Sequence, residues 1–99
     1  SERIAYEEEA KEAVSTDDAK KLFDAFLNHL EEIDEIDSDF AGSIMKTIQK
    51  ETGIKGKNLW FPVRAAVTGS VHGPDLSNAF LIMGKELVKE RLEYVRNNF

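Results

Sequence analysis

The sequence predicts an all-α domain, a compact bundle or cage of about five to six short helices. Apolar residues recur at spacings of three and four along most of the chain, as they do on one face of an amphipathic helix. No segment alternates apolar and polar residues in the way that a half-buried strand does. Because a chain of 99 residues can bury one core but not two, we expect a single domain spanning residues 1–99.

The first part of the chain predicts a weak helix and then a strong one. A thin apolar stripe from Ile4 to Val14 predicts a helix that docks only loosely. Ser15 or Thr16 then offers a hydroxyl that can cap the next helix. The expected buried face of this second helix consists of Leu22, Phe23, Phe26, Leu27, Leu30 and Ile33.

A third helix is expected over about residues 39–52, with Ser38 as its cap and Gly53 as its left-handed C-terminal residue. The acidic run over residues 32–39 that precedes it is interpreted as a solvated helix end. It does not match a calcium-binding helix–loop–helix, because that loop needs a glycine at its sharp turn and no glycine occurs before Gly42.

The remainder of the chain also predicts helices. We expect Pro62 near the first turn of a short helix, where its missing N–H costs little, and residues 68–70 at the end of that helix. Trp60 is expected in the core because large aromatic side chains are usually mostly buried. Asp75 is a suitable cap for a final helical stretch that Gly84 divides in two.

Charge is distributed unevenly along the chain. The net charge is −6, but residues 1–40 carry 14 acidic and 4 basic side chains, whereas residues 41–99 carry 5 acidic and 9 basic ones. Such asymmetry is compatible with an RNA-facing second half. The glutamates at positions 7, 8, 9 and 12 are interpreted as a solvated helix face.

Composition also indicates the setting of the protein. The chain has no cysteine, so it offers neither a disulfide framework nor a thiolate zinc site, and a cytoplasmic location fits. No apolar run approaches the roughly 20 residues that cross a bilayer. Because Ser1 stands where an initiator methionine would be, we expect the chain to be part of a longer protein.

Catalytic motifs are missing from the sequence. It contains no glycine-rich phosphate loop, no His-Glu-x-x-His zinc helix and no serine or cysteine nucleophile motif. His29 falls within the strong second helix and is interpreted as a structural histidine. His72 falls in a loop, where RNA contact and a turn-stabilising hydrogen bond are both compatible with the sequence.

The segment over residues 55–76 differs from the rest of the chain. It reads KGKNLWFPVRAAVTGSVHGPDL and holds both prolines and the only tryptophan. Its cationic side chains interleave with Trp60 and Phe61, a mixture that suits a phosphate backbone and unstacked bases. Together with the Met-Gly-Lys-Glu run at residues 83–86, this segment resembles the C-terminal anticodon-binding domain of bacterial-type, class I glutamyl-tRNA synthetases.

The resemblance implies a set of RNA-binding residues. In that family the arginine of this run reads anticodon bases, and it corresponds to Arg64, whose guanidinium offers a flat face and a fork of donors. A loop of Gly-Pro-x-Leu form brings backbone groups close to base edges. The candidates for anticodon binding are Arg64, Gly73, Pro74, Leu76, Phe61 and His72, and those for phosphate contacts are Lys55 and Lys57.

The function implied by the resemblance is anticodon recognition in a glutamate–tRNA ligase. The domain would position tRNA for ATP-dependent attachment of glutamate by a catalytic domain of the same polypeptide that is absent from this chain. The expected partners are that catalytic domain and the anticodon loop of glutamate tRNA, without DNA, a membrane, a metal or a cofactor in this domain. The alternatives are a free-standing helical RNA-binding module and a helical protein-interaction module with an acidic face.

Overall fold

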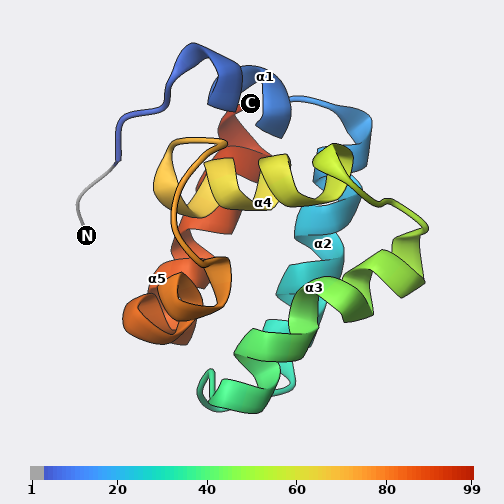
Figure 1. Ribbon diagram of the computed structural model, residues 1–99, viewed down its shortest axis with the longest axis vertical. Helices are drawn as coiled ribbons and strands as arrows, with labels where there is room; N and C mark the ends of the chain where they lie inside the picture. The colour runs from blue at the N-terminus through green and yellow to red at the C-terminus, as the bar shows by residue number, and fades with distance from the viewer. Residues whose placement is uncertain (1–3) are drawn as a thin grey trace.

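The computed structural model describes residues 4–99, and these residues form helices and loops without any strand (Figure 1). The helices are α1 (Glu8–Val14), α2 (Asp17–Glu31), α3 (Ser38–Thr52), α4 (Lys57–Thr68) and α5 (Leu76–Asn98). The predicted all-α class is therefore confirmed. The Cα atoms of the structure have a radius of gyration of 12.0 Å, close to the roughly 13 Å expected of a globular domain with about 100 residues.

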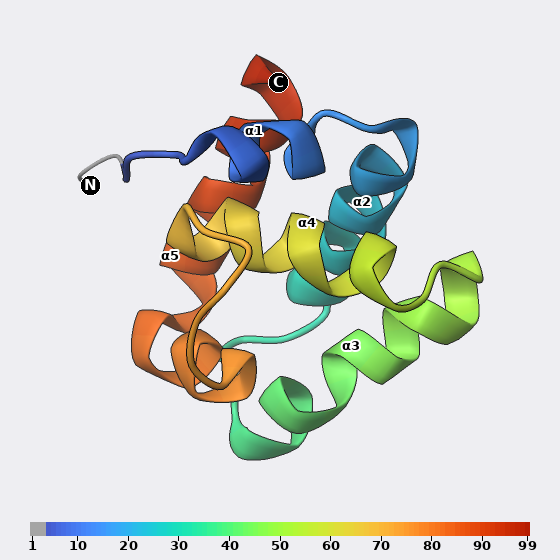
Figure 2. The ribbon, with the colours of Figure 1, turned by 45° about the horizontal axis from the view of Figure 1, so that its top comes forward.

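Helix α4 runs across the middle of the molecule and contacts each of the other helices. Figure 2 shows α1 lying along one side of α4, with α3 on the opposite side. Helices α2 and α5 pack against each other and against α4. One face of α4 is thereby buried, while another side remains free to meet solvent.

The core is centred on the apolar face of α2. The ring of Phe26 packs edge-on against Phe80 of α5, with ring centroids 5.2 Å apart, and against Phe40 of α3 at 6.2 Å. Leu22 is fully buried, as its position on that face predicts. Leu27 is only partly buried, so the expectation that it belongs to the fully buried face is wrong; it packs against the edge of the core.

Side-chain caps fix where the first helices begin. The Thr16 hydroxyl accepts from Ala19 N at 3.0 Å, as predicted for one of two candidates. The cap of α3 is Asp37, whose Oδ1 accepts from Phe40 N at 2.8 Å. The prediction of Ser38 as the cap is wrong because Ser38 is already in the helix and the extended residue before it is Asp37.

The N-terminal segment departs from its prediction. The first helix begins only at Glu8, and the preceding described residues have no helical structure. The Glu7 N–H donates to the Gly69 carbonyl at 3.1 Å, which ties this segment to the end of α4. Within α1, Ala10 and Val14 are fully buried. The helix is therefore firmly docked, and the prediction of loose docking is wrong.

Two predictions for α4 are also wrong. Pro62 lies in the interior of the helix, so the Asn58 carbonyl lacks its usual helical donor. The early start of the helix at Lys57 causes this difference. Trp60 is 41% exposed, because the helix turns its neighbours Leu59 and Val63 into the core instead.

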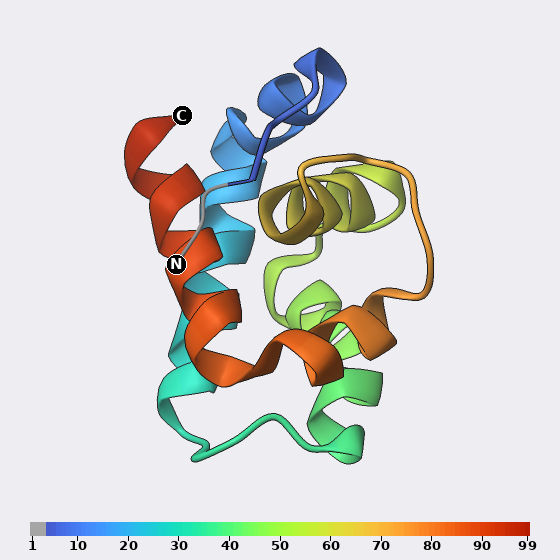
Figure 3. The same cartoon turned by 90° about the vertical axis from the view of Figure 1, so that its left-hand side faces the viewer.

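Helix α5 bends at Gly84, as predicted, where φ is 81° and ψ is 169°. Figure 3 shows the two arms of α5 meeting at this bend. Beyond it, the Arg91 guanidinium donates to the Val67 carbonyl at 2.6 Å. Lys89 lies 3.1 Å from Glu31, and this hydrogen bond and the opposite charge raise the pKa of Lys89. Polar contacts thus join α5 to α4 and α2. Among the helices of residues 4–99, none is long and apolar enough to cross a membrane.

We expect Leu22→Ala to lower the free energy of unfolding by about 2–5 kcal/mol, because it removes fully buried methyl groups and leaves a cavity. Leu27→Ala is the matched control, with the same atoms removed from a partly buried site, and should cost measurably less. Urea denaturation followed by circular dichroism measures both. Equal losses would contradict the assignment of Leu22 to the core and Leu27 to its edge.

Gly69→Ala should destabilise the fold more than Gly53→Ala. Both glycines have positive φ, at 86° and 76°, so each alanine carries about 1–2 kcal/mol of left-handed strain. A Cβ at Gly69 would in addition collide with the Ala5 carbonyl oxygen, whereas at Gly53 it would meet no atom within 4 Å. Thermal unfolding of both variants compares them, and equal losses would show that the N-terminal segment does not lie over Gly69.

Candidate nucleic-acid interface

Three candidate residues form a row along the solvent side of α4. Lys57, Phe61 and Arg64 are spaced by four and three residues, which places them on one face of the helix. The Lys57 ammonium lies 5.8 Å from the centroid of the Phe61 ring. Core residues occupy the other side of α4, so the fold presents this row outward.

The loop between α4 and α5 lies beside this row. Figure 3 shows it descending along the outer side of the molecule from one helix to the other. Val71 anchors it, since its side chain is almost fully buried. The next residue, His72, is exposed, and its ring packs edge-on against Phe61 with centroids 5.8 Å apart. The loop thus adds an imidazole to the aromatic and basic row.

Arg64 connects the helix directly to the loop. Its Nη1 donates to the Pro74 carbonyl at 2.5 Å, and Gly73 beside it has a φ of 152°. A guanidinium has five N–H donors, so this bond leaves others for a ligand. The hydrogen bond holds the guanidinium plane and the Gly73-Pro74 backbone in one place.

The structure brings most of the predicted site residues together, but not all. Lys57, Phe61, Arg64 and the loop residues form one continuous surface. The Leu76 side chain is buried in the core, so only its backbone can face a ligand. Lys55 is exposed in the segment before α4, beyond Lys57, and makes no hydrogen bond or ion pair with the other candidates in the described part of the chain.

Glu9 is a neighbour of the candidate interface that the sequence did not indicate. Its Oε1 lies 3.5 Å from His72 Nε2, so a side chain interpreted as part of a solvated face stands at the edge of the candidate interface. No local signal distinguishes it from Glu7 and Glu8. Only the packing of α1 on α4 sets it apart. The other histidine, His29, lies 2.9 Å from Glu51, as a structural histidine would.

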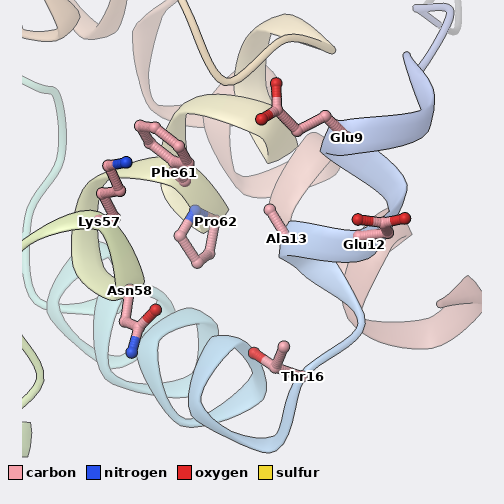
Figure 4. A pocket seen from close by; sticks show the side chains of 8 residues that line it. All are labelled: Glu9, Glu12, Ala13, Thr16, Lys57, Asn58, Phe61 and Pro62. Carbon is pink, nitrogen blue, oxygen red and sulfur yellow. The ribbon is translucent and has the colours of Figure 1, made fainter.

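A groove separates α1 from this row (Figure 4). Its volume is about 280 Å³, and its lining consists of Glu9, Glu12, Ala13, Thr16, Lys57, Asn58, Phe61 and Pro62. Within residues 4–99, no group of three or more histidine or acidic side chains is arranged to hold a metal ion. What the surface does offer is aromatic rings, cations and a fixed guanidinium. These are the groups that bind unpaired nucleotides.

Comparison with known proteins agrees with this chemistry. The sequence profile of the family described as "Anticodon binding domain" matches residues 1–96. The chain therefore belongs to the anticodon binding domain family.

The curated relatives of this chain are glutamate–tRNA ligases. The chain is 43% identical to a glutamate–tRNA ligase of Finegoldia magna over 91 residues and 42% identical to that of Geobacillus stearothermophilus over 92. These alignments cover 92% and 93% of this chain but only 19% of each relative. The chain thus spans about a fifth of the length of the enzymes it matches. No solved structure matches it.

Proposed function

We propose that this chain is the anticodon-reading domain of a glutamate–tRNA ligase. In this proposal it binds the anticodon loop of glutamate tRNA, and a catalytic domain of the same polypeptide attaches glutamate to the tRNA with ATP. The domain itself uses no cofactor, and the enzyme acts in the cytoplasm during protein biosynthesis. Family membership and the glutamate–tRNA ligase relatives support the proposal.

The hydrogen bond between Arg64 and the Pro74 carbonyl is the observation that carries the proposal. A guanidinium that is fixed before RNA arrives loses little side-chain entropy on binding. Its flat face can stack on an unpaired base while its remaining N–H groups donate to that base. Lysine would keep the charge but not the plane or the fork of donors.

The neighbouring residues complete a binding surface for a single-stranded loop. His72 supplies an exposed ring and Phe61 a half-buried one for base stacking, and Lys57 supplies a cation for a phosphate. Lys55 extends the basic edge beyond the start of α4. Gly73 presents its backbone near Arg64 without a side chain, and its φ of 152° is one that other residues rarely adopt. A Cβ there would make only an ordinary contact with Arg64 Nη1, at 3.6 Å.

Arg64→Ala should weaken binding of the chain to a glutamate-tRNA anticodon stem-loop by about 1–3 kcal/mol, because it removes one base contact or stack. Arg64→Lys should recover only part of this loss. Fluorescence anisotropy with a labelled stem-loop at fixed salt measures both.

Arg96→Ala is the matched control for charge. Arg96 of α5 forms an ion pair with Asp24 of α2, away from the row on α4. Its loss should therefore weaken RNA binding much less than the loss of Arg64. If Arg64→Ala and Arg96→Ala weakened binding equally, Arg64 would contribute only its charge. Unchanged binding in Arg64→Ala would instead favour a partner other than an anticodon.

A further inference from the structure

The groove between α1 and α4 is not used by the contacts described so far. Pro62 and Ala13 provide apolar surface, and Phe61 forms one wall (Figure 4). Its volume of about 280 Å³ lies just below the roughly 300–1,000 Å³ of small-molecule sites. The groove therefore suits one flat heterocycle better than a larger ligand. It also shares Phe61 and Lys57 with the candidate interface.

Glu9 gives this groove a specific polar group. In Figure 4 its side chain reaches from α1 toward Phe61, whereas the carboxylate of Glu12 stays over α1. Glu9 Oε1 lies 3.5 Å from His72 Nε2. Its Oε2 has no hydrogen-bond partner among the residues that the structure describes, and it remains able to accept from a ligand.

A carboxylate is unfavourable beside RNA unless it accepts a hydrogen bond from a base, because it repels phosphates. Carboxylates accept from exocyclic amino groups such as N4 of cytosine. Uracil has no amino group, and its single ring N–H is flanked by two carbonyl oxygens that a carboxylate repels. A carboxylate in such a groove therefore favours bases that carry an amino group over uracil, although it repels the phosphates of any RNA.

We propose that the groove between α1 and α4 holds one unstacked base of the RNA loop, and that Glu9 selects a base with an exocyclic amino group against uracil. This inference rests on the proposed function and names a further specificity-determining residue for it. The half-buried ring of Phe61 contacts the flat face of the base, and Lys57 at the rim meets its phosphate. His72 Nε2 lies 3.5 Å from the Glu9 carboxylate at the edge of the groove.

The test measures the affinity of the chain for anticodon stem-loops that differ only in the base at one loop position, each position being varied in turn. At one position, the wild-type chain should bind an amino-bearing base about tenfold more tightly than uracil, the scale of one good base contact. In Glu9→Gln this ratio should fall to within about twofold, because an amide can donate as well as accept.

Glu12→Gln is the matched control, since it removes the same charge from the same helix. It should strengthen binding of every stem-loop slightly and leave the ratio between bases unchanged. Circular dichroism checks that both variants fold, as expected for exposed side chains.

Two results would overturn the inference. One is the absence of any preference against uracil in the wild-type chain. The other is an unchanged ratio in Glu9→Gln, which would show that the Glu9 carboxylate does not discriminate between bases. In either case, continued dependence on Arg64 would leave the proposed function intact. Failure of the wild-type chain to bind any stem-loop would contradict both the inference about Glu9 and the proposed function.

Discussion

The burial of one face of α4 is the constraint on which the rest of the structure depends. Val63, Ala66 and Val67 are fully buried, so the rotation of the helix about its axis is fixed. At 3.6 residues per turn, that rotation determines that Phe61 and Arg64 reach the surface. The position of the candidate interface is therefore a consequence of core packing, and large-to-small substitutions beneath α4 would disturb it without touching a ligand.

The loop after α4 converts this exposed face into a site. Gly69 ends the helix in the left-handed region, and its carbonyl accepts a hydrogen bond from the Glu7 N–H. The same residue therefore positions both the loop and the N-terminal segment. Val71 then enters the core, and Arg64 bonds the Pro74 carbonyl. The site is preorganised by short-range contacts, which keeps the entropy lost on binding small.

Local chemistry decided which features could be predicted from the sequence. The caps at Thr16 and Asp75, the left-handed Gly53 and the break at Gly84 depend on neighbouring residues alone. The exposure of Trp60 and the position of Glu9 beside His72 were not predictable, because both depend on how helices distant in sequence pack. The family resemblance supplied Arg64 as a candidate, and the structure supplied its hydrogen bond to the loop.

The most direct test of the central claim is NMR titration of the chain with a glutamate-tRNA anticodon stem-loop and with a copy whose anticodon is scrambled. We expect shifts centred on Arg64, His72 and residues 73–76 with the first RNA only. Equal shifts with both RNAs would contradict base-specific reading by this surface, and so would shifts located mainly on α3.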